Sequence, residues 1–131
     1  MSVSIARGVS AEIPPKVIGI TIEGKGFAIT TGTKGFIIVP YNARIRSWSL
    51  FANTSGSAII DIWKAGYPNI PTVSNSITGT DKPILNNQRE NHNLLISDWV
   101  DSNINAEDTI GFNIDSVDGL LTNLTLILRV D

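Results

Sequence analysis

The chain has 131 residues, of which 42% are hydrophobic and 17% charged, a length that suits one domain with its own core. It contains no cysteine, which excludes disulfides and thiolate metal sites. Residues 1–50 hold six Lys/Arg and two Asp/Glu, whereas residues 51–131 hold four and ten, so the halves carry +4 and −6; the basic residues are too scattered to predict a nucleic-acid partner.

The hydrophobic residues are distributed in short groups. No run approaches the roughly 20 apolar residues that a membrane-spanning helix requires, and the chain does not begin with a basic start followed by an apolar block. We therefore expect no membrane insertion and no secretory signal.

The first third of the sequence is predicted to form an arm followed by short strands. Residues 1–16 end in two prolines and are expected to form an extended arm, which would fray in a monomer or lie on a neighbour in an oligomer. Residues 17–22 alternate like a half-buried strand. The glycines of 23–26 and 32–35 indicate turns, which leaves 27–31 and 36–39 as the next two strands.

The middle of the chain predicts two longer strands. Residues 41–52 are rich in β-branched and aromatic side chains, but their alternation is imperfect, which a bulge near Ser47 would explain. Residues 53–56 indicate a turn, and 57–63 alternate cleanly. This alternation places Asp61 and Trp63 on the outward face.

A long irregular segment, about 64–90, follows. Its aromatic, proline and small polar residues are typical of loops that contact ligands or partners. We expect it to be packed onto the domain rather than disordered, because it contains six apolar residues that can anchor it: Tyr67, Ile70, Val73, Ile77, Ile84 and Leu85. Residues 86–91 suggest a helical turn, and 92–99 a strand-like run.

The C-terminal part carries the clearest strand patterns. Residues 104–108 indicate a β-turn, residues 109–115 a strand, and Asp118-Gly119 another turn. Residues 124–130 alternate strictly between Leu or Val and other side chains. Together the patterns predict an all-β fold, an antiparallel, jelly-roll-like β-sandwich formed by residues 17–131 as a single domain.

Little in the sequence predicts catalysis. His92 is the sole histidine and lies in no nucleophile motif. The carboxylates are scattered through turns, without the spacing of a calcium loop, and glycosidases need two carboxylates in fixed positions. We therefore expect no enzyme activity, no cofactor and no metal site.

Carbohydrate or partner contact is a weaker possibility near the long loop. An aromatic ring can stack on a sugar while amide and carboxylate groups bind its hydroxyls. The candidate residues are Trp63, Tyr67, Asn69 and Asp81. For Trp63 the alternative, which we favour, is that the loop covers the ring and that the indole N–H is satisfied there.

Several motifs occur in an order that resembles a domain of bacteriophage and prophage virion proteins, often in tail-fibre or receptor-binding contexts. The resemblance covers roughly residues 20–131. The matching segments include Gly32-Thr-Lys-Gly, Val39-Pro40, Asp61-Ile-Trp-Lys64, Ser76-Ile-Thr-Gly79, Lys82-Pro83-Ile-Leu85 and Phe112-Asn-Ile-Asp-Ser116. The family usually has Gly-Asp before the penultimate strand, where this chain has Glu107-Asp108.

The resemblance implies a non-catalytic virion structural protein, of the tail-fibre, receptor-binding or capsid-decoration type, made in the cytoplasm of a bacterial host. It also implies a homotrimer that contacts other virion proteins or a host surface glycan. It assigns no site residue. The alternative from the residues alone is a stand-alone, lectin-like carbohydrate-binding module.

Overall fold

The computed structural model describes residues 16–131, so the proposed N-terminal arm lies outside the described residues except for Lys16. Lys16 already belongs to the first described strand, β2 (Lys16–Glu23). The other strands are β3 (Gly32–Val39), β4 (Ala43–Gly66), β5 (Ile84–Asn93), β6 (Asn103–Ile104), β7 (Asp108–Val117) and β8 (Asn123–Val130). A short 3-10 helix, η1 (Val73–Asn75), lies between β4 and β5.

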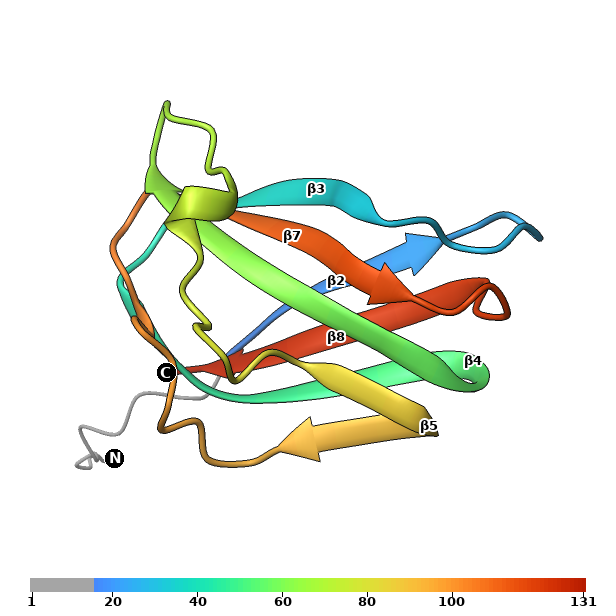
Figure 1. Cartoon of the computed structure of the whole chain (residues 1–131). Helices are drawn as coiled ribbons and strands as arrows, with labels where there is room; N and C mark the ends of the chain where they lie inside the picture. The colour runs from blue at the N-terminus through green and yellow to red at the C-terminus, as the bar shows by residue number, and fades with distance from the viewer. Residues whose placement is uncertain (1–15) are drawn as a thin grey trace, which may run out of the picture.

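The strands form a curled antiparallel sheet, which confirms the all-β, jelly-roll-like prediction. The strand order is β2-β8-β4-β7-β3, and β5 and β6 both pair with β4. In Figure 1, β4 runs beside β8, bends sharply and returns beside β7. β5 pairs with both parts of β4, with register shifts around Gly56. The predicted turn at 53–56 is therefore a bend within one continuous strand.

The core lies inside this curl. β7 contributes Ile110, Phe112 and Ile114, which are fully buried on one face. β8 contributes alternate residues from Leu124 to Val130, all fully buried. These two strands follow their predicted alternation because burial of one face fixes the register of a strand.

A bulge in β4 lies where the sequence predicts it. The register shifts between Ile45 and Ser47, opposite consecutive residues of β8. Before the shift Ile45 is buried, and after it Trp48 and Leu50 are buried, so the buried positions change from odd to even numbers. The extra residue thus keeps the apolar side chains on the core side despite the imperfect alternation.

Other predictions near the N-terminus were wrong. Residues 27–31 form no strand, and the Phe27 side chain is 78% exposed. The predicted turn at 32–35 is the start of β3, where a bulge between Thr33 and Gly35 accommodates the glycines. The strand predicted at 17–22 is confirmed as part of β2, which pairs with the distant β8.

The boundaries of the long loop also need correction. β4 continues to Gly66 and β5 begins at Ile84, so the irregular segment is residues 67–83. Residues 86–91 are strand rather than a helical turn, and 94–99 are irregular. Of the six expected anchors only Ile77 and Leu85 are buried; Tyr67, Ile70, Val73 and Ile84 are exposed.

Two leucines provide a matched test of this core. Leu126 of β8 is fully buried, whereas Leu120 is 71% exposed in the turn before β8. We expect Leu126→Ala to lower the free energy of unfolding by about 2–5 kcal/mol because it leaves a cavity. Leu120→Ala should change it by less than about 0.5 kcal/mol. Urea unfolding measures both, and equal losses would contradict the described core.

Candidate functional site

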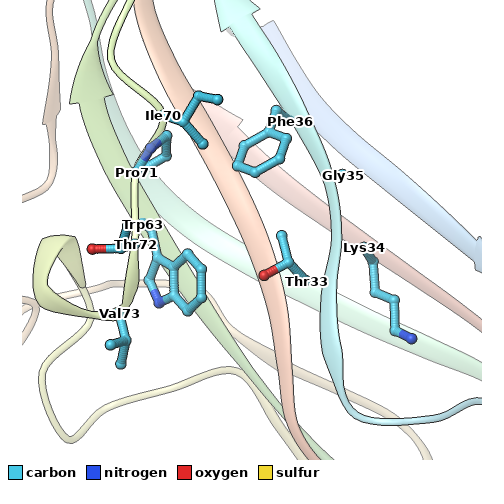
Figure 2. A pocket seen from close by; sticks show the side chains of 9 residues that line it. All are labelled: Thr33, Lys34, Gly35, Phe36, Trp63, Ile70, Pro71, Thr72 and Val73. Atoms are coloured by element: carbon cyan, nitrogen blue, oxygen red, sulfur yellow. The ribbon is translucent and has the colours of Figure 1, made fainter.

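An open, apolar pocket of about 640 Å³ lies on the outer face of the sheet. β3 contributes residues 33–36, β4 contributes Trp63, and the segment after β4 contributes residues 70–73. Figure 2 shows Phe36 and Ile70 near one end, the Trp63 indole near Val73, and Lys34 pointing away from the aromatic rings. The pocket therefore brings together β3 and β4, which flank β7 in the sheet, and the irregular segment that follows β4.

A glycine of β7 lies between two aromatic residues that line this pocket. On β7, Gly111 pairs with Phe36 of β3 on one side and with Trp63 of β4 on the other. A Cβ at Gly111 would lie 3.1 Å from the Phe36 ring and 3.3 Å from Pro71. The missing side chain therefore lets Phe36 and Pro71, which both line the pocket, pack closely against β7.

The walls of the pocket contain few polar groups. Its lining has no carboxylate and no side-chain amide, and its one charged residue is Lys34. Phe36, Ile70 and Val73 are 47%, 70% and 71% exposed. Exposed apolar groups gathered in one place are typical of surfaces that bind other macromolecules.

The Trp63 ring forms part of a wall and is itself only 8% exposed. Its backbone forms a bridge with Ser76 of the irregular segment, and its indole N–H donates to Asp61 Oδ2 at 3.0 Å. The expectation that the segment covers Trp63 is confirmed. The acceptor, however, lies on β4 itself and not in the loop.

Asp61 is the polar centre beneath this wall. The sequence analysis placed it on the outward face, but the structure buries it, at 2% exposure, among the side chains of Trp63, Ser76, Thr78 and Lys82. Its Oδ1 accepts the Ile62 backbone N–H at 2.8 Å and the hydroxyls of Ser76 and Thr78, each at 2.7 Å. One carboxylate thus joins β4 to the irregular segment.

The ionised form of Asp61 is favoured despite its burial. Burial alone would raise its pKa, but hydrogen bonds from Ser76, Thr78 and Trp63 and the nearby charge of Lys82 hold the pKa below 3.8. Lys82 Nζ lies 3.7 Å from Asp61 Oδ2. Asp61 therefore remains charged and bound to its donors at neutral pH.

Lys82 extends the network to β7. Its Nζ donates to Asp115 Oδ2 at 2.6 Å, and this bond is the largest cause of its raised pKa. Asn113 also donates to Asp115, at 2.8 Å. The irregular segment is consequently fixed to both β4 and β7.

The structure does not bring the four sequence-predicted contact residues into one site. Trp63 lines the apolar pocket, whereas Tyr67 and Asn69 are exposed and line none of the described pockets. Asp81 lies in a separate hollow of about 530 Å³ with Lys82 and Asp115. Sequence reasoning missed Phe36, Pro71 and Gly111, because cross-strand pairing between β3, β7 and β4 brings them together.

Within residues 16–131, no helix is long and apolar enough to cross a membrane. In the same part of the chain, no three His, Asp or Glu side chains cluster in a way that could hold a metal ion.

Comparisons with known proteins give distant structural matches. A crystal structure of the SPBc2 prophage-derived protein YomS matches with a TM-score of 0.47 and 18% identity, covering 94% of this chain and 100% of that one. The capsid of Ralstonia phage GP4 matches with a TM-score of 0.46 and 12% identity, covering 98% and 90%. No family model and no curated protein sequence matches. At these TM-scores and identities, the matches assign neither a family nor a function to this chain.

Replacing Asp61 tests the network directly. We expect Asp61→Ala to lower the free energy of unfolding by about 3 kcal/mol or more, because it leaves buried donors without an acceptor. Asp98→Ala is the control. Because Asp98 is exposed, this substitution should lower the free energy of unfolding by less than about 0.5 kcal/mol. Urea unfolding at neutral pH measures the difference. A loss for Asp61→Ala as small as the control's would contradict the network.

Acid should weaken the same network. The pKa of Asp61 is lower in the folded chain than its ordinary value of 3.8. The ionised carboxylate therefore stabilises the fold above about pH 4, and this stabilisation is lost as the pH falls through the pKa of the folded chain. We expect the free energy of unfolding of the wild-type chain to fall more steeply below about pH 4 than that of Asp61→Asn, which has no proton to bind at this position. Urea unfolding across this pH range measures both slopes, and parallel curves would count against the assignment.

Proposed function

We propose that the chain is a non-catalytic bacteriophage virion structural protein, of the tail-fibre, receptor-binding or capsid-decoration type. It acts by associating with copies of itself, as a homotrimer, and by binding neighbouring virion proteins or the host surface. The virion setting comes from the ordered sequence motifs of residues 20–131. The observation that carries the mode of action is the apolar pocket with its exposed rim.

The pocket suits a protein surface better than a sugar. Sugar sites combine a ring face with amide or carboxylate groups that bind hydroxyls, and the lining contains neither of these polar groups. The Trp63 ring is largely covered, whereas the exposed Phe36 and Ile70 offer apolar side chains. Burying such side chains against an apolar partner surface is favourable at about 25 cal/mol per Å². We therefore assign the pocket to contact between subunits.

The arrangement of the carboxylates supports a non-catalytic role. Asp61 and Asp115 both contact Lys82, and Asp61 is buried among donors. A glycosidase needs one carboxyl group that can donate a proton and a second that faces the substrate. The lowered pKa of Asp61 holds it in the ionised form, which is the opposite of what a proton donor needs.

Two pairs of substitutions test the pocket as a subunit contact. We expect the wild-type chain to sediment as a trimer and Phe36→Ser with Ile70→Ser to weaken association by about tenfold or more, because both side chains lose apolar burial. Phe27→Ser with Leu94→Ser is the control, since these residues are exposed outside the pocket lining. Sedimentation equilibrium measures both pairs.

A wild-type chain that stays monomeric at high concentration would overturn the proposed self-association. If both pairs weaken association equally, the pocket is not part of the interface between subunits. Binding on a glycan array that Trp63→Ala or Tyr67→Ala abolishes would instead favour the lectin-like alternative.

A further inference from the structure

β2 and β3 are the two ends of the strand order, and residues of both strands line one groove. At one end, Lys16 Nζ lies 4.9 Å from the centre of the Tyr41 ring. Further along, a Cβ at Gly35 would lie 3.2 Å from Ile20 Cδ1. Between these contacts is a groove of about 260 Å³, lined by residues 17–19 of β2 and by residues 37–41. The curled sheet therefore nearly closes on itself along this groove.

The groove offers the contacts that an added strand needs. Its eight lining residues include no charged side chain. Ile18 and Val39 are buried on the core side, while Val17 and Ile38 are 67% and 45% exposed. The backbone groups on the outer edges of β2 and β3 pair with no other strand among residues 16–131, and such edges readily pair with a further extended segment.

The sequence of residues 1–13 has the pattern of such a strand. Its odd positions are apolar except for Arg7, and its even positions are small or polar. This period of two gives a strand one apolar face and one polar face. The segment contains no proline, so every residue after the first can donate a backbone hydrogen bond. The apolar residues are Met1, Val3, Ile5, Val9, Ala11 and Ile13.

Two prolines, Pro14 and Pro15, disfavour a tight return of residues 1–13 into the groove of their own chain. Lys16 and Val17 already pair with β8, so a tight reversal alongside β2 would place Pro14 and Pro15 at its centre. Pro15 disfavours the helical conformation at Pro14, and proline cannot adopt a positive φ. The common two-residue turns need either a helical conformation at the first central residue or a positive φ at one of the two central residues. The sequence therefore favours a second copy of the chain as the source of such a strand, and residues 1–13 would span about 40 Å if extended.

We propose that residues 1–13 of a second copy of this chain lie as an added β-strand in the groove between β2 and β3. The apolar face of the strand covers the core side of the groove, and its serines face solvent. The exchange of arms closes the curled sheet and links the subunits. The proposal rests on the self-association included in the proposed function and adds a second contact between subunits to the one at the apolar pocket.

Substitutions on the two faces of the arm test this in the full chain. Val3→Asp with Ile5→Asp should weaken association by about tenfold or more, because charge replaces the buried apolar groups. Ser2→Asp with Ser4→Asp adds the same charge to the other face of the arm. This pair should change the association constant by less than about threefold. Sedimentation equilibrium measures both, and circular dichroism checks that the folds match. Equal effects of the two pairs, or none, would overturn the proposal.

Cross-linking identifies which copy supplies the arm. The chain has no cysteine, so full-length Ser4→Cys or Ser10→Cys can be mixed with full-length Ile38→Cys under mild oxidation. We expect a disulfide-linked dimer of the two variants from at least one arm position, and none when Leu120→Cys replaces Ile38→Cys. A further variant carries both cysteines in one chain. If a disulfide forms only within that chain, the groove holds the chain's own arm, and the exchange is overturned.

The outcomes separate the two proposals. A trimer that persists after both apolar substitutions, without cross-links, overturns the arm exchange and leaves self-association standing. A wild-type chain that remains monomeric overturns both.

Discussion

The carboxylate of Asp61 is the interaction on which the outer surface of this protein depends. A charged group with 2% exposure is costly unless its hydrogen bonds are satisfied, and here donors from β4 and from the segment after it both supply them. The backbone follows the same path, since Ile77 donates to Ile62 O and Ile60 donates to Pro83 O. Residues 76–83 are thereby held along the edge of β4, with the side chains of Ser76, Thr78 and Lys82 against Asp61.

The apolar pocket is a consequence of that attachment. Trp63 is held by its bond to Asp61, and residues 70–73 lie over the sheet because the chain must return to Ser76 beside Trp63. Gly111 then lets Phe36 and Pro71 pack closely against β7 beside Trp63. A polar network with little exposure thus shapes an exposed apolar surface, and the two have different roles. The network stabilises the fold, whereas the exposed rim is available to a partner.

The sequence predicted the strands whose own side chains determine their burial. β7 and β8 alternate because one face is fully buried, and the bulge in β4 left a visible break in alternation. β5 was missed because its residues are mostly polar. It is a strand because its backbone pairs with β4 on both sides of the bend, and no local pattern records that pairing.

The candidate site was predictable only in part, for the same reason. The aromatic residue Trp63 and the irregular segment after it stood out in the sequence, and the covering of Trp63 was expected. The depression needs Phe36, Gly111 and Trp63 in one row across three strands, and long-range register sets that row. Likewise, Ser76 and Thr78 lie 15 and 17 positions after Asp61 in the sequence, and no motif connects them to it.

Amide hydrogen exchange in Asp61→Asn tests the central claim, that this carboxylate holds residues 76–83 on the sheet, most directly. The probe is the Ile77 N–H, which donates to Ile62 O at 2.9 Å, and the reference is Leu126 in the core. The account predicts that the substitution lowers protection at Ile77 by about tenfold more than at Leu126, because the segment opens locally. Unchanged protection at Ile77, or an equal decrease at both positions, would contradict it.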